Sequence, residues 1–251
     1  MGRVDLRLTR VIAGWKRTDT PPRRRKPVPM SVLMESDKLA RGYDKPRELA
    51  IADLTWIGFY YLLRPGEYLY TAKGRYPFTL GDIVLRLGAQ EYTADTIPLQ
   101  LLPLVTYAGL TFTMQKNGVP GEMIGLTRTG ALLECPVRAV VRRVQHLGIY
   151  TNARDTPLYV YYDHAGVSRR ISDRHLTAHL RIAATLLGLK VNTTAGALRC
   201  TGATALLQGK VPLELIKLVG RWRSDEVFKY LHAQSEPLMN PLSSAMLAAA
   251  S

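Results

Sequence analysis

The chain has 251 residues, 47% of them hydrophobic and 22% charged, an ordinary balance for a globular protein that can bury a sizeable core. Lysine and arginine outnumber aspartate and glutamate by 34 to 20, and the net charge of +14 favours nucleic acid, or else an anionic membrane surface, as partner. Without an apolar run of about 18 residues or a secretion signal, the protein is expected to be intracellular. Cys135 and Cys200 stand alone, so neither a zinc site nor a disulfide framework is indicated.

The first 30 residues divide into two segments. Residues 1–17 carry Val4, Leu8 and Val11 at helical spacing, like the last helix of a larger unit. Residues 18–30 are predicted to be a basic linker, because prolines resist helix and sheet and adjacent cations repel one another. Its cations are candidates for DNA contact or for a nuclear import signal: Arg23, Arg24, Arg25 and Lys26. Residues 31–251 are predicted to form the main domain, with a tail from about residue 236.

Two predicted helices open the main domain. Ser31 can cap a helix that runs through about residue 38. The next helix places Ile51, Leu54, Ile57 and Tyr61 on one apolar stripe and stops at the Pro-Gly pair of residues 65–66. The second helix is therefore expected to present one apolar face.

Strand patterns follow, and then four helices. Residues 76–92 and 110–115 favour strands, and 122–126 can be the return strand of a hairpin. Lys116-Asn117-Gly118 supplies the turn, since Asn-Gly tolerates positive φ angles. Helices are predicted at 136–147, 173–187, 198–208 and 212–219, with Gly209 and Gly220 as C-terminal stops. The sequence predicts a mostly α (α+β) domain with one small antiparallel sheet.

Two arginines are candidates for phosphate binding. Arg64 leaves the second helix at its Pro-Gly stop, where its guanidinium can bind two phosphate oxygens and Glu67 can orient it. The alternative is an ordinary surface pair. Arg199 lies in a helix of small and apolar residues, so burial would call for an anion or a carboxylate partner. Its alternative place is the solvent-exposed face of that helix.

A lysine and a tyrosine could complete the chemistry. Lys116, at the hairpin tip, could reach a DNA groove and donate a proton to a leaving 5′ oxygen, although hairpin tips often carry solvated lysines. Tyr230 follows the turn at 220–224 and is either a core tyrosine or a nucleophile. Each residue alone is weak evidence, so the interpretation depends on the set.

The set resembles the catalytic domain of the tyrosine recombinase (phage integrase) family. An L-R-P-G-E segment, a lysine hairpin, an L-R-x-x-x-A-x-x-L-L helix, a G-R-W-x-S turn and a tyrosine ten residues after that glycine occur in the order and spacing of that family. These motifs are most similar to those of the branch carried by eukaryotic tyrosine-recombinase retrotransposons and related mobile elements. The resemblance spans roughly residues 26–232.

The resemblance implies site-specific DNA recombination. Members of the family break and rejoin double-stranded DNA through a 3′-phosphotyrosine, with no cofactor, metal or nucleotide. They assemble as homotetramers on DNA and often exchange C-terminal tails. Residues 31–251 would be the catalytic domain, and residues 1–17 the remnant of an N-terminal helical DNA-binding (core-binding) domain. No membrane partner is expected, and in a eukaryote the protein would act in the nucleus.

The residue roles follow by position. Arg64 and Arg199 match the paired arginines, and Glu67 the acidic residue after the first of them. The remaining matches are Lys116 for the hairpin lysine, Arg221 or Trp222 for the histidine or tryptophan before the nucleophile, Tyr230 for the nucleophile, and Arg223 for a DNA contact.

One position departs from the family pattern. The histidine of its H-x-x-R arrangement falls at Gly196, and loss of one acid-base group costs about 10²- to 10⁴-fold in rate. His175 or His179 could fill the gap from a neighbouring helix. Three readings stay open: a recombinase acting through Tyr230, a decayed or domesticated derivative that binds DNA without cutting it, and a type IB topoisomerase.

Overall fold

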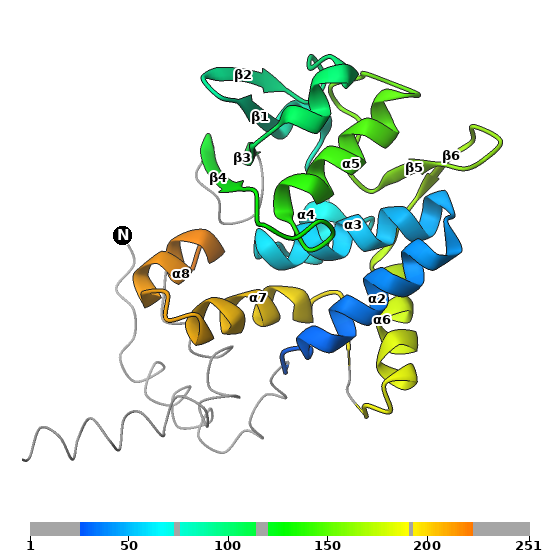
Figure 1. Cartoon of the computed structure of the whole chain (residues 1–251), viewed down its shortest axis with the longest axis vertical. Coiled ribbons are helices and arrows are strands. Elements are labelled where there is room, and N and C mark those ends of the chain that lie inside the picture. The colour runs from blue at the N-terminus through cyan, green and yellow to red at the C-terminus, as the bar shows by residue number, and fades with distance from the viewer. Residues whose placement is uncertain (1–25, 73–75, 114–119, 191–192, 223–251) are drawn as a thin grey trace, which may run out of the picture.

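Helix α3 (Pro46–Tyr60) lies at the centre of the protein, with other helices around it (Figure 1). The computed structural model describes residues 26–72, 76–113, 120–190 and 193–222. Within these ranges α3 packs against α2 (Met30–Tyr43), α5 (Pro136–Gly148), α6 (Asp173–Leu186) and α7 (Ala197–Gln208). Residues 50–59 of α3 are all buried. The predicted single apolar stripe was wrong, because a helix enclosed on all sides needs apolar or small residues around its whole circumference.

Helix α2 begins before its predicted cap. Met30 is its first residue and Pro29 precedes it, so Ser31 lies inside the helix and is not the N-cap. The helix also continues past residue 38 and ends at Asp44, which has a left-handed φ of 48°. The prediction of a helix here was therefore correct in kind but wrong at both ends.

A buried ionic network ties α2 to α3 and α5. Arg41 donates hydrogen bonds to Asp37 (2.9 Å) and Asp53 (3.0 Å), and Arg142 of α5 donates to Asp53 at 2.6 Å. Trp56 of α3 donates its indole N–H to Asp37 at 2.9 Å. Burial raises the pKa of the Asp53 carboxyl, and Arg142 and Arg41 oppose that rise. These buried carboxylates thus depend on their arginine partners.

The main sheet is antiparallel, with strand order β2-β1-β3-β4. Its strands are β1 (Ile83–Leu87), β2 (Gln90–Thr93), β3 (Tyr107–Phe112) and β4 (Glu122–Thr127), and the 3₁₀ turns η1 (Leu80–Asp82) and η2 (Leu99–Leu104) precede β1 and β3. Strands β3 and β4 pair from Tyr107 with Thr127 to Phe112 with Glu122, which confirms the predicted hairpin. Its tip, residues 114–119, lies outside the described residues.

A second sheet was not predicted. Strands β5 (Val160–Tyr162) and β6 (Ser168–Arg170) form a short antiparallel ribbon. All three residues of β6 are exposed, so the sequence carries no alternation of buried and exposed positions from which a strand could be recognised.

The C-terminal helices lie where they were predicted. Helices α6, α7 and α8 (Leu213–Gly220) each begin and end close to their expected bounds. Gly209 caps α7, whereas α8 ends in Gly220 and its cap is Arg221, with a left-handed φ of 55°. Helix α7 approaches α3 closely at Gly202, where an added Cβ would overlap the carbonyl oxygen of Phe59.

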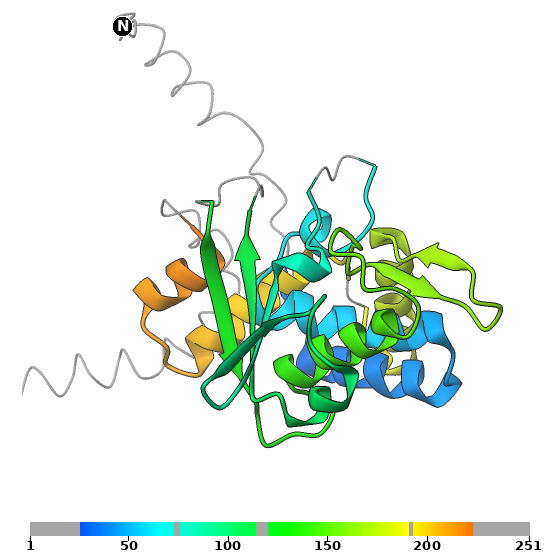
Figure 2. The same ribbon diagram turned by 90° about the horizontal axis from the view of Figure 1, so that it is seen from above.

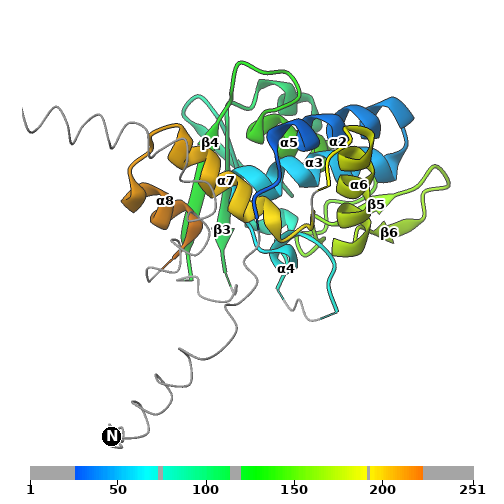
Figure 3. The ribbon, with the colours of Figure 1, turned by 90° about the horizontal axis from the view of Figure 1, so that it is seen from below.

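The ends of several elements meet along one edge of the protein. The end of β3, the start of β4, the short helix α4 (Pro65–Tyr68) and the end of α8 lie along the upper edge of Figure 2 and the lower edge of Figure 3. This edge brings residues near positions 64, 112 and 221 together. The predicted N-terminal remnant and the predicted C-terminal tail lie outside the described residues.

Candidate active site

Arg64 and Glu67 form a local motif at the start of α4. Arg64 is the N-cap residue, and its backbone N–H donates to Glu67 Oε2 at 2.8 Å while its Nη1 donates to Oε1 at 3.2 Å. Pro65 suits the first helical position because it lacks an N–H. The side chain of Arg64 is 32% exposed and that of Glu67 only 7%. Glu67 therefore fixes the backbone and one guanidinium nitrogen of Arg64, whose side chain still reaches the surface.

Arg199 is buried, at 4% exposure, and so does not lie on a solvent-exposed face of α7. Its Nη1 donates to the carbonyl oxygen of Leu62 at 2.7 Å, and its Nη2 donates to the carbonyl oxygen of Gly220. An anion or a carboxylate was predicted as the partner of a buried Arg199, whereas these two contacts are to backbone oxygens. The guanidinium also lies 4.4 Å from the ring centroid of Trp222, a cation–π contact.

Arg221 joins the same cluster from the end of α8. Its Nη2 donates to Glu67 Oε2 at 3.0 Å and to the carbonyl oxygen of Leu62 at 3.3 Å. Its guanidinium lies 3.9 Å from the ring centroid of Phe112 at the end of β3. Burial lowers the pKa of Arg221, and the Glu67 carboxylate opposes that shift. Arg221 thus links the other two arginines, because it shares the Glu67 carboxylate with Arg64 and the Leu62 carbonyl with Arg199.

Arg221 and Trp222, which the sequence left as alternatives, occupy different places. Arg221 contacts Glu67, whereas Trp222 packs in a small apolar cluster with Leu62, Ala203 and Ile216 and covers Arg199. Gly220 allows this arrangement, because a Cβ there would overlap the indole of Trp222.

The backbone of Leu62 was not foreseen as part of the site. Helix α3 ends with Leu63 N–H donating to the Gly58 carbonyl at 3.1 Å, and Leu62 takes a left-handed φ of 49°. This is a helix C-terminal motif in which glycine is usual. The turn aims the Leu62 carbonyl at Arg199 and Arg221. The sequence carries no signal for this turn, because a left-handed helix end is predicted from glycine and not from leucine.

Gly196, which stands where the family pattern has a histidine, is buried at the N-cap of α7, one turn before Arg199. Neither suggested histidine replaces it. His179 Nε2 lies 2.9 Å from the Ser36 carbonyl oxygen of α2, and His175 Nδ1 accepts from the backbone N–H of Ser172 at 3.3 Å. Both rings are therefore engaged away from Arg199.

Several predicted site residues cannot be placed. Lys26 is exposed at the start of the described chain. The other candidates lie outside the described residues: Arg23, Arg24, Arg25, Lys116, Arg223 and Tyr230. Within ranges 26–72, 76–113, 120–190 and 193–222, no cluster of three or more His, Cys, Asp or Glu side chains could hold a metal ion. The same ranges contain no helix long and apolar enough to cross a membrane.

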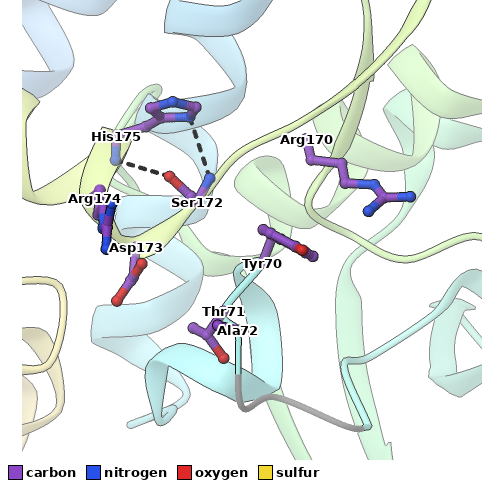
Figure 4. Close-up of a pocket in the computed structure, with 8 residues that line it drawn as sticks. All are labelled: Tyr70, Thr71, Ala72, Arg170, Ser172, Asp173, Arg174 and His175. Carbon is purple, nitrogen blue, oxygen red and sulfur yellow. Dashed lines mark hydrogen bonds between the residues drawn. The ribbon is translucent and has the colours of Figure 1, made fainter.

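A cavity of about 910 Å³ opens where α4 and the start of α6 meet (Figure 4). The backbone pins the two segments together, with Tyr70 N–H donating to the Ile171 carbonyl and Asp173 N–H to the Tyr70 carbonyl. The guanidinium of Arg170 lies 5.2 Å from the Tyr70 ring centroid. The lining residues are Tyr70, Thr71, Ala72, Arg170, Ser172, Asp173, Arg174 and His175.

This cavity has the electrostatics of an anion-binding surface. Arg170 and Arg174 line it beside the N-terminus of α6, whose free N–H groups favour negative charge, although Asp173 offsets part of it. The sequence analysis missed it, and the signal was the run of cations at 169, 170 and 174 around a Ser-Asp helix start. Desolvation is the main cause that lowers the pKa of His175 here, and nearby Arg47 adds to it.

Comparison with known proteins identifies the fold. By sequence, no protein-family model and no curated protein matches the chain. By structure, nineteen chains of solved proteins match. One of them is XerA recombinase, a tyrosine recombinase, with a TM-score of 0.52 and 14% identity over 90% of this chain. The match covers 66% of the XerA chain, just under two thirds.

At this level of identity the likeness shows the fold alone. The protein has the mixed α+β fold of a tyrosine recombinase catalytic domain, with helices around α3 and a small antiparallel sheet. The predicted fold class is confirmed. The roles of individual residues are not tested by this comparison and stay predictions.

Proposed function

We propose that this protein is a recombinase that binds duplex DNA and cleaves it through Tyr230, leaving a 3′-phosphotyrosine. The observation that carries the proposal is a cluster of three arginines at one edge of a recombinase-like fold, in which Arg64 and Arg221 donate to Glu67 while Arg199 and Arg221 donate to the Leu62 carbonyl. A phosphodiester in transfer gains negative charge on its non-bridging oxygens. Guanidiniums that are already fixed stabilise that charge without reorganising.

The proposed step is a single displacement at phosphorus. The Tyr230 phenol loses its proton to solvent and its oxygen attacks phosphorus, the bond to the 5′ oxygen breaks, and Lys116 donates the proton that turns the leaving oxygen into a hydroxyl. Attack by a 5′-hydroxyl of another strand reverses the step and rejoins the DNA. Arg64, with its side chain 32% exposed, is the guanidinium best placed to meet the phosphate. The positions of Tyr230 and Lys116 are part of the proposal.

The DNA would lie across the arginine cluster and the neighbouring cavity. Arg170 and Arg174 lie beside the segment that follows α4, and the whole chain carries a net charge of +14. Phosphate contacts release counterions, so affinity should fall steeply as salt is added. A flat salt response would exclude duplex DNA as the partner.

A second candidate function is DNA binding without cleavage. Gly196 favours it, because a phenol with a pKa near 10 needs a base or a strong positive field, and glycine supplies neither. The arginine cluster can provide the field. The two candidates therefore differ in whether that field alone activates Tyr230.

The finer features of the proposal come from the sequence motifs. We propose that the reaction serves recombination of a mobile element related to the eukaryotic retrotransposon branch, in the nucleus. A homotetramer on DNA, with exchange of the segment after residue 236, belongs to the same proposal. The G-R-W-x-S turn at 220–224 supports the choice of branch.

Covalent capture of DNA separates the two candidates. The protein is incubated with a pool of nicked random-sequence duplexes, in which cleavage releases a short strand and traps the adduct on a denaturing gel. The recombinase proposal predicts an adduct that is lost in Tyr230→Phe and kept in Tyr150→Phe, a matched change at an exposed tyrosine after α5. Intact protein that binds the pool but forms no adduct would leave only the binding function.

A further inference from the structure

Arg221 differs from Arg64 in its access to substrate. The side chain of Arg221 is 2% exposed, whereas that of Arg64 is 32% exposed, although both donate to the same carboxylate. A phosphate that approaches the surface can reach Arg64 but not Arg221. The face of the Arg221 guanidinium is also covered by the Phe112 ring.

The contacts of Arg221 connect four elements. Its backbone caps α8, its Nη2 reaches Glu67 of α4 and the carbonyl at the end of α3, and its guanidinium lies on Phe112 of β3. Phe112 is four residues before Lys116, and Arg221 is nine residues before Tyr230. The side chain thus lies between the end of β3 and the start of α4.

The remaining donors of Arg221 argue against a role in stability alone. Its Nε and Nη1 are buried, and neither has a hydrogen-bond partner among the residues that the structure describes. Buried ion pairs are often no better for stability than apolar residues of similar size, and unpaired buried donors add a cost. A residue kept at this cost is expected to do something that an apolar side chain could not do, and here that is to hold the Glu67 carboxylate.

We propose that Arg221 is a positioning residue that fixes Glu67, and through Glu67 fixes Arg64, without touching the scissile phosphate. The inference rests on the proposed function of the same site. It assigns Arg221 a different task from the phosphate-binding role that the family resemblance implied. Arg64 then has its orientation set from two sides, by its own helix cap and by the end of α8.

A binding experiment tests the inference without cleavage. Affinity for a nicked duplex is measured over a range of salt for Arg64→Ala, for Arg221→Gly and for the double variant. Glycine is chosen because it keeps the left-handed backbone of residue 221. Arg64→Ala should lower the salt slope by about one unit. Adding Arg221→Gly to Arg64→Ala should change neither affinity nor slope, whereas loss of a further unit would mean a direct phosphate contact and overturn the inference.

A rate experiment tests the same inference through catalysis. Single-turnover cleavage by Arg221→Gly should be about 100-fold slower, because small misplacement of a catalytic group has an effect of that size. Arg221→Lys should recover part of the rate. Glu67→Gln combined with Arg221→Gly should be no slower than the slower single variant, since both act on one group. Effects that multiply would overturn the inference.

A matched control separates positioning from stability. Arg142→Ala removes another partly buried arginine from a carboxylate, Asp53, at 2.6 Å, outside the cluster. It should destabilise the protein but leave the cleavage rate of folded protein unchanged, and if it slowed cleavage as much as Arg221→Gly the inference would fail. If Arg221→Gly does not fold, Arg221→Lys and Glu67→Gln decide the same question. Absence of any wild-type adduct would refute the proposed function. The affinity measurements on Arg64→Ala, Arg221→Gly and the double variant would still decide the role of Arg221.

Discussion

Replacing Glu67 by alanine should strongly destabilise the folded protein. The Glu67 side chain is 7% exposed and accepts three hydrogen bonds, from Arg64 N–H at 2.8 Å, Arg64 Nη1 at 3.2 Å and Arg221 Nη2 at 3.0 Å. Without the carboxylate, the buried guanidinium of Arg221 keeps the Leu62 carbonyl as its one hydrogen-bond acceptor among the described residues. An uncompensated charge would then remain inside the protein.

The magnitude follows from these contacts. Breaking a buried ion pair by removing one partner costs about 3–5 kcal/mol. The contact to the Arg64 side chain adds little, because that guanidinium is 32% exposed and partly screened by solvent. Loss of the acceptor for the Arg64 N–H adds about 1 kcal/mol, as for other helix caps. We therefore expect Glu67→Ala to lower the free energy of unfolding by about 4–6 kcal/mol, and Glu67→Gln, which keeps one acceptor oxygen, by about half of that.

Equilibrium unfolding in urea measures this change. With a slope of about 2 kcal/mol per molar, the midpoint should fall by about 2–3 M for Glu67→Ala. Glu91→Ala is the matched control, because Glu91 also pairs with an arginine, Arg86, at 2.7 Å, but both side chains are largely exposed. Its midpoint should barely move. Equal midpoints for the two variants would refute the view that Glu67 holds buried charge in place.

Three further changes test other parts of the structure by the same urea assay. Gly202→Ala should lower stability by about 1–3 kcal/mol, because the methyl group would press on α3, whereas Gly209→Ala meets only ordinary contacts and should be neutral. Trp56→Phe should cost about 1.5–3 kcal/mol, because the buried bond to the Asp37 carboxylate is lost. Burial and a neighbouring arginine lower the pKa of His146 from 6.5 to about 4, so only the unfolded chain gains a proton in that window. Stability should fall as pH drops from about 6.5 to about 4, and His146→Gln should flatten that fall.

Most helices and the hairpin could be predicted because their signals are local. Apolar periodicity, Pro136 at a helix start and Asn117-Gly118 in a turn each report on a few adjacent residues. The apolar stripe assigned to α3 was wrong for the opposite reason, since enclosure on all sides depends on helices far away in the sequence. The β5–β6 ribbon was missed because its strands are only three residues long.

The site was predictable in composition but not in its contacts. Resemblance singled out Arg64, Arg199 and Glu67, and they do meet through the Leu62 carbonyl and Arg221. The partners themselves could not be predicted, because a backbone carbonyl is present at every residue and only the fold selects one. A sequence-based search for carboxylate partners of Arg199 was bound to overlook the Leu62 and Gly220 oxygens.

Strain at two helix ends explains how such a site is built. Leu62 and Arg221 both take left-handed φ angles, 49° and 55°, where residues other than glycine lose about 1–2 kcal/mol. Glycine would relieve the strain at either place. It would also remove the Leu62 side chain from its buried cluster with Ala203 and Ile216, or remove the guanidinium that meets Glu67. The strained turns bring the Leu62 carbonyl and Arg221 Nη2 to 3.3 Å.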